Sequence, residues 1–355
     1  MKITFVMLGL KDHSTGGYSF NLRMAEALKK AGHAVDIIHY RTVPEAARGS
    51  RVRGSLLVLW RVLKNRPDAL VVSKSYSFMA PVRFLLPLLR IPVLYMVHHL
   101  EWHDRDEDVS PIRKKLVRWF LLGGDRVWVN SRCTASEVCS LGVAEERIAV
   151  IPPGYDPFPV PSLEERDLPV KVVSVGAICP RKDQLTLVRA CSPLKNLDFQ
   201  LHILGNESSD SDYAEEVRRL ADSSPISSRI FFHGHLPVEQ LRKFYGNGHI
   251  LANPSRWEGY GMAVVEALQS GLPVVAVNAG AVPELVEHGV NGFLVPAGDS
   301  GALSECIEKL ISSGTLRNEF SRNALKKAGE LNTWEDTERE FVSLVESPEL
   351  KSKAR

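Results

Sequence analysis

The protein has 355 residues, enough for two domains of ordinary size. It is 44% hydrophobic and 24% charged, which is typical of a soluble globular protein. Its 44 Lys and Arg residues against 42 Asp and Glu residues leave a net charge of only +2, which argues against a dedicated nucleic-acid-binding protein. The five cysteines are scattered and include no CxxC pair, which favours reduced thiols in a cytoplasmic protein over a disulfide framework.

Short β-branched runs alternate with helical patterns along the first half of the chain. The run at residues 2–8 has no small-residue cleavage site after it, so we expect a first strand rather than a signal peptide. A helix is expected over residues 17–31, and Gly32 ends it. The longest apolar stretch, residues 84–97, is interrupted by two prolines and an arginine, and it is shorter than the roughly 20 residues of a membrane-spanning helix. Further strands are expected at residues 34–40, 69–73, 92–99 and 126–131.

The same alternation restarts after a proline-rich segment. Residues 151–170, "IPPGYDPFPVPSLEERDLPV", hold six prolines, which cannot continue a helix or a central strand, and we interpret them as a linker. The pattern predicts two α/β domains, each with a doubly wound parallel sheet, over residues 1–160 and 161–332. Ligands are then expected at the carboxyl ends of the strands, in a cleft between the domains. Residues 333–355 are expected to form a C-terminal helix that packs back toward the first domain, with a frayed tail. Strands of the second half are expected at residues 170–177, 199–205, 229–234, 249–255 and 273–278.

The stretch "SRWEGYGMAVVEALQSG", residues 255–271, places two glutamates eight positions apart around a glycine-rich turn. Gly259 and Gly261 allow a ligand to approach the backbone, and the N–H groups at the start of the following helix favour an anion. Glu258 on the turn and Glu266 on the helix can reach one cavity, where carboxylates would accept hydrogen bonds from sugar or ribose diols. A solvated helix cap with two unrelated carboxylates is equally consistent with these residues taken alone.

Residues 255–299 as a whole resemble the signature of the family-4 retaining glycosyltransferases (glycosyl transferases group 1). They hold an E-x7-E element, then G-x-P-V-V-A, then G-x-x-P-E-L-V-x-x-G-x-N-G-F-L-V. The resemblance covers nearly the whole chain and is weaker in the first half. It implies a GT-B fold, two Rossmann-like domains facing across a cleft, with the acceptor on the first domain and the nucleotide sugar mainly on the second. It implies that Glu258 contacts donor-sugar hydroxyls and that Glu266 holds the ribose diol. It also implies that backbone groups near the sugar and the distal phosphate belong to Gly259, Tyr260, Gly261 and Met262.

A second motif is the run "VGAICPRKDQLTLVRA" at residues 175–190, in which two cations follow a predicted strand. Adjacent cations there can neutralise a diphosphate, although an isolated Arg-Lys pair is usually a solvated loop pair. The loop resembles the family's G-R-L-x-x-x-K-G phosphate clamp, which implies that Lys182 binds the diphosphate. The arginine of that pattern falls on Ala177 and its final glycine on Asp183. Arg181 is the candidate to replace the missing cation, and a weaker phosphate site is the alternative.

Two features of the first half are candidates for the same reaction. Gly16 and Gly17 lie between a predicted strand and helix, where a phosphate or acceptor can approach the helix start, and a plain turn is the alternative. They are not a GxGxxG motif, so a dinucleotide-binding fingerprint is absent. The resemblance implies a glycine-rich loop near the leaving phosphate at this position. It also aligns His98, at a predicted strand end, with a histidine near the reacting sugar, whereas a purely structural histidine is the alternative.

Other patterns are assigned no metal-binding role. His99 and His103 have the i, i+4 spacing of metal ligands, and residues 104–106 and 210–212 mimic a DxD motif, but no further ligand signature accompanies them. We therefore expect no metal and no cofactor. Residues 110–124 predict a helix in which apolar residues recur at helical spacing beside basic ones: Ile112, Leu116, Trp119 and Phe120 beside Arg113, Lys114, Lys115 and Arg118. Such a helix either packs on the sheet as an ordinary amphipathic helix or docks peripherally on anionic lipid.

These features together predict a metal-independent, retaining glycosyltransferase. It would move a sugar from a UDP- or GDP-linked donor to a hydroxyl of a glycan or lipid-linked glycan, as in cell-envelope glycan synthesis. We expect Lys182, Arg181, Glu258 and His98 to serve the reaction, which the resemblance implies is a front-face substitution. A UDP-sugar 2-epimerase and a nucleotide-sugar-binding protein on the same fold remain alternatives. The expected location is the cytoplasm, with contact at the inner face of the membrane through residues 110–124, and no nucleic-acid partner is expected.

Overall fold

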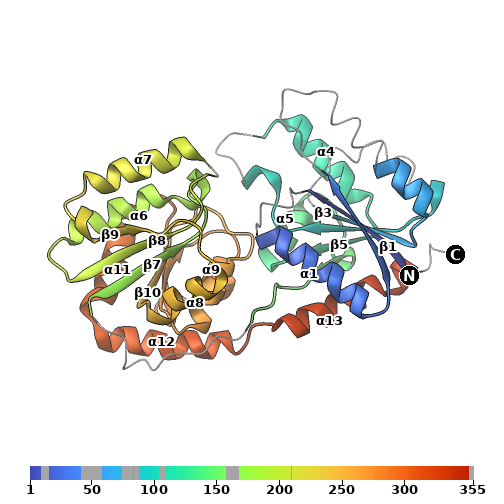
Figure 1. The fold of residues 1–355 in the computed structure, drawn as a ribbon. Coiled ribbons are helices and arrows are strands. Elements are labelled where there is room, and N and C mark those ends of the chain that lie inside the picture. The colour runs from blue at the N-terminus through green and yellow to red at the C-terminus, as the bar shows by residue number, and fades with distance from the viewer. Residues whose placement is uncertain are drawn as a thin grey trace. The chain divides into compact units, whose positions relative to one another are not determined.

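The computed structural model describes residues 1–8, 16–40, 58–73, 83, 88–103, 109–156, 168–208 and 210–351. The chain divides into two compact units (Figure 1). Unit 1 comprises Met1–Trp102, Glu107–Gly154 and Asn332–Arg355, and unit 2 comprises His103–Asp106 and Tyr155–Leu331. The expected boundary between residues 160 and 161 lies outside the described residues.

Unit 1 is built on a six-stranded parallel sheet in the order β2-β1-β3-β4-β5-β6. Helices cover both faces, because alternate residues of each strand point to opposite sides: Phe5 packs with α1 residues and Val6 with α4 residues. The strands are β1 (Lys2–Leu8), β2 (Ala34–Tyr40), β3 (Ala69–Ser73), β4 (Val93–Val97), β5 (Arg126–Val129) and β6 (Ile148–Val150). The helices with defined bounds are α1 (Gly16–Lys30), α4 (Pro111–Leu122), α5 (Arg132–Ser140), α13 (Trp334–Val345) and α14 (Pro348–Lys351), and residues 58–65 are also helical. The 3-10 turns are Glu101–His103, whose last residue is grouped with unit 2, and Glu145–Arg147.

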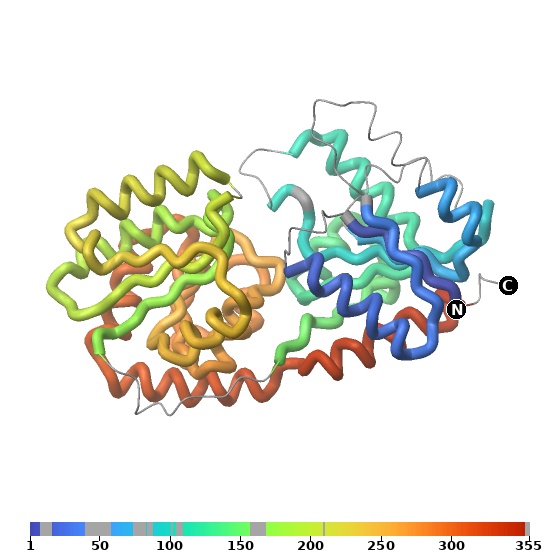
Figure 2. Tube along the Cα trace, in the orientation of Figure 1, coloured from blue at the N-terminus to red at the C-terminus, as the bar shows by residue number. Residues whose placement is uncertain are grey.

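The C-terminal segment belongs to unit 1. Figure 2 shows this red segment beside the blue N-terminal elements, and α13 packs against α1. Arg23 of α1 donates from Nε to Glu338 Oε1 at 2.6 Å, and Phe341 is fully buried with its ring centroid 6.4 Å from that of Phe5. Thr333 caps α13 in a capping box with Asp336, which fixes where the helix begins.

Unit 2 repeats the architecture with the strand order β12-β11-β10-β7-β8-β9, all parallel. The strands are β7 (Val170–Val175), β8 (Phe199–Leu204), β9 (Ile230–Phe232), β10 (Ile250–Asn253), β11 (Val274–Val277) and β12 (Gly292–Val295). The helices are α6 (Gln184–Cys191), α7 (Ser211–Asp222), α8 (Val238–Asn247), α9 (Met262–Gln269), α10 (Val282–Leu285), α11 (Ser300–Ser312) and α12 (Gly314–Ala328), with 3-10 turns at Pro180–Lys182, Ser192–Leu194 and Ser227–Arg229.

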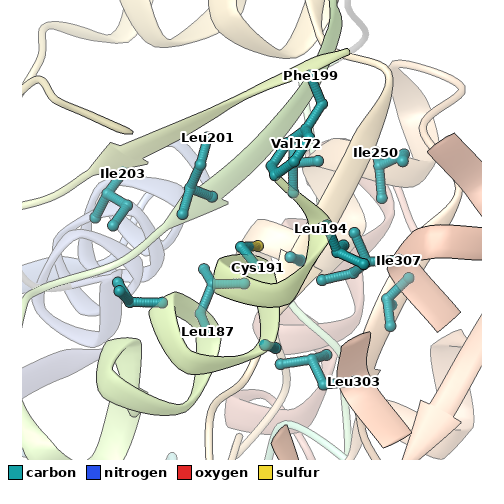
Figure 3. Close-up of a cluster of buried hydrophobic side chains, with 14 of the residues drawn as sticks. Val172, Leu187, Cys191, Leu194, Phe199, Leu201, Ile203, Ile250, Leu303 and Ile307 are labelled. Atoms are coloured by element: carbon teal, nitrogen blue, oxygen red, sulfur yellow. The ribbon is translucent and has the colours of Figure 1, made fainter. Parts of the chain in front are cut away.

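The sheet of unit 2 is buried on both faces. Ile250 of β10 packs into the cluster formed with α6, α7 and α11, part of which is drawn in Figure 3, whereas its neighbour Leu251 packs with α8, α9 and α12. Each fully buried aliphatic or aromatic side chain of this kind contributes about 1.5–3 kcal/mol to folding. The expected fold class, two doubly wound α/β domains, is therefore confirmed. Among the described residues, no helix has the length and apolarity needed to cross a membrane.

Candidate active site

The site of unit 2 begins where two neighbouring parallel strands end. β7 and β10 adjoin, and the strand order changes direction between them, with β8 and β9 on one side and β11 and β12 on the other. Doubly wound sheets bind ligands outside the carboxyl ends of their strands at such a switch point. The loop after β7 carries the 3-10 turn Pro180–Lys182, and the loop after β10 carries Glu258. The topology thus brings two predicted motifs together although 76 positions separate them.

The centre of this site is an ion pair between Lys182 and Glu258. Lys182 Nζ lies 2.5 Å from Glu258 Oε1, and the two side chains are only 14% and 8% exposed. Asn253, the last residue of β10, donates from Nδ2 to the same Glu258 oxygen at 3.4 Å, and its own Oδ1 accepts from Ser255 Oγ at 2.6 Å. A buried carboxylate needs such partners, because an unpaired charge away from water is costly.

The charges on either side keep Glu258 ionised. Burial by itself raises the pKa of this carboxyl, but the charges of Lys182 and Arg181 and the hydrogen bonds from Lys182 and Ser255 outweigh it. The pKa of Glu258 therefore lies below its ordinary value. A carboxylate held in this way is a poor base, so its arrangement suits the binding of polar groups better than proton abstraction.

Arg181 also approaches the Glu258 carboxylate. Its Nη1 donates to the carbonyl oxygen of Trp257 at 2.9 Å and lies 3.7 Å from Glu258 Oε2. Ala177, which holds the place of the clamp arginine in the family pattern, has no side-chain charge to contribute. The structure therefore gathers two cations, Lys182 and Arg181, around one buried carboxylate.

The glycine-rich turn leads directly into α9. Gly261 has φ +100°, a left-handed conformation that favours glycine, and as N-cap it makes no side-chain hydrogen bond to the helix start. Tyr260 is buried, and Met262 is the first residue of α9. Backbone N–H groups of this first turn consequently have no side chain of the cap residue to satisfy them, which is the usual arrangement of an anion-binding helix start.

The backbone of Glu258 is held from the loop after β11. Ala281 donates its N–H to the carbonyl oxygen of Glu258 at 2.9 Å. Gly280 precedes it with φ +60°, and a Cβ at this position would lie 2.1 Å from the same carbonyl oxygen. Only glycine permits this close approach, so the position of Glu258 depends on the G-x-x-P-E-L segment as well as on its own loop.

The second glutamate, Glu266, lies on α9 and is partly buried. Its Oε2 accepts a hydrogen bond from Tyr245 of α8 at 2.7 Å. Burial raises the pKa of Glu266 above its ordinary value, although the Tyr245 hydrogen bond and the charges of Arg242 and Lys182 act in the opposite direction. The charge of Lys182 lowers the pKa of both glutamates, but burial dominates at Glu266 and the cations dominate at Glu258, so the two pKa values move in opposite directions. Tyr245 and Asn253 were not predicted from the sequence, where neither lies in a recognisable motif.

The predicted residues of the first half form a separate polar cluster in unit 1. Gly16 and Gly17 begin α1, and a Cβ on Gly17 would lie 3.3 Å from the His98 ring, so this glycine lets the helix start approach the histidine. His98 follows β4, and its Nε2 is 2.9 Å from Oδ1 of the buried Asn21, whose Nδ2 donates to Ser73 Oγ at 2.7 Å. With the Asn21 amide assigned in this way, Nε2 of His98 carries a proton and donates to Asn21 Oδ1.

The metal-like patterns have different outcomes. Asp210 is the N-cap of α7, where its Oδ1 accepts from Tyr213 N at 3.1 Å, so a helix cap accounts for its position. Residues 104–106 lie outside the described part of the chain. In the part that is described, no group of three or more His, Cys, Asp or Glu side chains is arranged to hold a metal ion.

Comparisons with known proteins show the family to which the chain belongs and the fold that it shares. The sequence profile of "Glycosyl transferases group 1" matches residues 148–327, just over half of the chain, and that of "Glycosyltransferase Family 4" matches residues 15–157. The chain belongs to the glycosyl transferases group 1 family. The two six-stranded parallel sheets are thus those of a GT-B fold, with two Rossmann-like units.

Individual relatives of this group 1 glycosyltransferase are moderately distant. A D-inositol 3-phosphate glycosyltransferase of Mycobacterium sp. (strain KMS) is 30% identical over 257 residues, or 68% of this chain, which spans only 58% of that relative's length. A GDP-mannose-dependent alpha-(1-6)-phosphatidylinositol monomannoside mannosyltransferase of Mycobacterium tuberculosis (strain CDC 1551 / Oshkosh) is 26% identical over 86% of this chain and 82% of its own length. The crystal structure of Anabaena Alr3699/HepE in complex with UDP and glucose superposes with a TM-score of 0.78 at 20% identity, covering 98% of this chain and 99% of the other.

Proposed function

We propose that the protein is a retaining glycosyltransferase that moves a sugar from a UDP- or GDP-linked donor to a hydroxyl group of a glycan or lipid-linked glycan. The observation that carries this proposal is the buried Lys182–Glu258 pair at the switch point of unit 2, with Arg181 beside it. Two cations there are suited to a diphosphate, and the pre-ionised Glu258 is suited to sugar hydroxyls. One relative is a GDP-mannose-dependent mannosyltransferase, and the structurally similar Anabaena Alr3699/HepE was crystallised with UDP and glucose, which supports the choice of donor classes.

Each group has a separate task in the proposed reaction. Lys182 and Arg181 stabilise the negative charge that develops on the departing diphosphate, which is the work that a divalent cation does in other transferases. Glu266 accepts hydrogen bonds from the ribose diol, Glu258 from the donor sugar, and the backbone of Gly259–Met262 lies near the sugar and the distal phosphate. Gly16, Gly17 and His98 serve the same reaction from unit 1. No metal ion or cofactor takes part in this scheme, and the nucleotide sugar is a substrate.

The chemical step is a front-face substitution at the anomeric carbon. The bond from this carbon to the diphosphate oxygen breaks, and the acceptor oxygen forms its bond on the same face, so configuration is retained. The acceptor proton passes to the departing phosphate oxygen. Glu258 does not act as a nucleophile, because its carboxylate is already held by two cations and by Asn253. The protein accelerates the step by positioning the two substrates and by stabilising charge.

A charge reversal tests this assignment. Lys182→Glu should reduce acceptor-dependent nucleotide release by at least about a hundredfold, which is the usual effect of removing a group that stabilises transition-state charge. Lys195→Glu, the same change at an exposed position of unit 2, should retain activity. Normal turnover in Lys182→Glu would refute the proposed site. Nucleotide release that needs no acceptor would instead favour a UDP-sugar 2-epimerase or hydrolase, and binding without turnover would favour a binding protein.

The donor itself can be found by thermal stabilisation. A ligand that binds only the folded state and is present at a hundred times its dissociation constant stabilises a protein by about 2.7 kcal/mol. We expect one member of a panel of UDP- and GDP-sugars to raise the melting temperature and Lys182→Glu to abolish that shift. A panel without any stabilising member would contradict the proposal.

The lipid-linked form of the acceptor is supported by the surface of α4. The helix buries Val117, Phe120 and Leu121 but leaves Ile112 72% exposed and Leu116 37% exposed. The helix has no acidic residue. Its exposed side also carries four basic residues: Arg113, Lys114, Lys115 and Arg118. Each basic residue close to an anionic bilayer contributes about 1 kcal/mol to binding. We therefore propose peripheral contact with an anionic membrane through residues 110–124.

Vesicle sedimentation tests the membrane contact. The double variant Ile112→Ser/Leu116→Ser should bind vesicles containing phosphatidylglycerol more weakly than the unaltered protein, with only a small loss of stability because neither side chain belongs to the core cluster. Val238→Ser, which alters an apolar side chain 61% exposed on unit 2, is the matched control. Equal binding of both variants and the unaltered protein would exclude α4 as the contact.

A further inference from the structure

The phosphate loop of unit 2 contains a residue in an unusual conformation. Asp183 has φ +50° and ψ +46°, the left-handed region, at the place where the family pattern has glycine. A residue with a Cβ adopts this conformation at a steric cost that glycine does not bear. A conformational cost of this kind persists where the side chain makes contacts that glycine could not make.

The Asp183 side chain makes two such contacts. One oxygen, Oδ1, accepts from Thr186 N at 3.4 Å and so caps α6, while the other, Oδ2, lies 3.0 Å from Arg256 Nε. The carboxylate is only 3% exposed, whereas the Arg256 side chain is 51% exposed. Asp183 is therefore a buried anion that fixes the start of a helix and holds an arginine from the loop after β10.

That arginine is joined to the phosphate loop a second time through its backbone. Arg256 donates its N–H to the carbonyl oxygen of Arg181 at 2.9 Å. In return, the Arg181 guanidinium donates from Nη1 to the carbonyl oxygen of Trp257 at 2.9 Å. Three hydrogen bonds thus run between residues 181–183 and residues 256–257, and together they fix both the backbone and the guanidinium of Arg181.

We propose that Asp183 and Arg256 are a positioning pair that holds Arg181 as the second diphosphate-binding cation, in place of the arginine absent at Ala177. Arg181 reaches the carboxylate that Lys182 also contacts, at 3.7 Å and 2.5 Å respectively. The two departures of this loop from the family pattern are then parts of one rearrangement. The cation moves from position 177 to position 181, and the aspartate at position 183 replaces a flexible glycine in order to hold it. This inference rests on the proposed diphosphate site.

Inorganic pyrophosphate is the probe, measured by titration calorimetry on the full chain. Arg181→Ala should weaken pyrophosphate binding about tenfold, as expected for the loss of one charged hydrogen-bond donor. Asp183→Asn keeps an oxygen that can cap α6 but removes the charge, and Arg256→Gln removes the partner. Each should weaken binding about two- to fivefold, the effect expected of a partly exposed ion pair. The Asp183→Asn/Arg256→Gln double variant should lose no more than either single variant.

The decisive measurement repeats the two changes in the Arg181→Ala background. If the pair acts through Arg181, Asp183→Asn and Arg256→Gln should there have no further effect on pyrophosphate affinity. Losses of the same size in both backgrounds would overturn the inference, because Arg256 would then contact the anion itself or support the loop in general. Asp183→Gly is the control for folding, since glycine adopts the left-handed conformation without strain and should keep unit 2 folded while weakening pyrophosphate binding like Asp183→Asn.

Failure of the pair and failure of the proposed function give different results. If the unaltered protein binds pyrophosphate and the losses are independent of Arg181, only the positioning role is refuted. If neither the unaltered protein nor any variant binds pyrophosphate, the diphosphate site itself is refuted, and the positioning role with it. In turnover assays the pair should affect the KM for the donor more than kcat, because it prepares the binding site before the sugar is transferred.

Discussion

Replacing Glu258 by glutamine should weaken catalysis and, at the same time, strengthen the binding of a bare diphosphate. Glutamine has nearly the same shape as glutamate and keeps an oxygen for Lys182 and Asn253, so the change removes mainly the charge. In the unaltered protein, an incoming diphosphate must compete with the Glu258 carboxylate for Lys182, 2.5 Å away, and for Arg181, 3.7 Å away. In Glu258→Gln both cations lack that competitor.

The magnitude follows from the burial of the pair. Removing one member of a buried ion pair costs about 3–5 kcal/mol when the other charge is left without water. Lys182 and Arg181 are 14% and 26% exposed, so some water reaches them, and we expect a loss of folding stability of about 2–3 kcal/mol, below or at the lower end of that range. A bound diphosphate restores the missing negative charge and recovers this free energy. Pyrophosphate should therefore bind Glu258→Gln about 30- to 140-fold more tightly than the unaltered protein.

The assay combines calorimetry with turnover. Pyrophosphate affinity should rise in Glu258→Gln, while transfer from the nucleotide sugar should fall by about a hundredfold because the sugar loses a charged hydrogen-bond acceptor. The pKa of Glu258 lies below its ordinary value, so its stabilising charge is present above that ordinary value and is lost as the pH falls through the lowered pKa. The difference between the two proteins should therefore disappear on acidification. Pyrophosphate affinity equal to or lower than that of the unaltered protein at neutral pH would refute the reasoning.

Three further changes have defined outcomes. Gly280→Ala places a Cβ 2.1 Å from the Glu258 carbonyl oxygen and should abolish donor-induced thermal stabilisation, whereas Gly289→Ala, also at positive φ but with open space around it, should only lower the melting temperature slightly. Glu266→Gln should gain stability relative to the unaltered protein as the pH rises above 4.5, because the raised pKa of Glu266 makes its ionisation destabilising over that range. Urea unfolding at several pH values measures this difference in stability, and a difference that stays constant would contradict the prediction. Asn21→Ala should lower kcat and cost about 1–3 kcal/mol in urea unfolding, since it removes the hydrogen bonds to the buried Ser73 hydroxyl and to the half-buried His98 ring. An unchanged kcat would show that His98 has no part in the reaction.

Local periodicity was sufficient to predict the fold class. The alternation of β-branched runs with helical patterns specified parallel strands, because a strand buried on both faces needs a continuous apolar run and a crossover helix. The expected strands at residues 92–99 and 126–131 were nevertheless too long, since β4 ends at Val97 and β5 at Val129. The polar residues that follow, such as His98, leave the ladder and lie at the carboxyl edge of the sheet.

The sequence likewise predicted the candidate site of unit 2 only in part. The sequence presented Glu258 and Lys182 as separate motifs, and the structure joined them in one ion pair. In the structure Arg181 also lies beside that pair, and Tyr245 donates a hydrogen bond to Glu266. None of these contacts has a local signal, since they depend on which strands are neighbours.

The sequence also did not specify which side of α4 is exposed. The predicted apolar face held Ile112, Leu116, Trp119 and Phe120. Of these the structure fully buries Phe120, together with Val117 and Leu121, and leaves Ile112 and Leu116 exposed. The sequence by itself determined which segments are helices and strands and which residue types could bind a nucleotide sugar, because these depend on neighbours along the chain. The tertiary structure decided the Lys182–Glu258 pair, the direction of Arg181 and the exposed face of α4, because charges and apolar surfaces act through space on residues that the chain order keeps far apart.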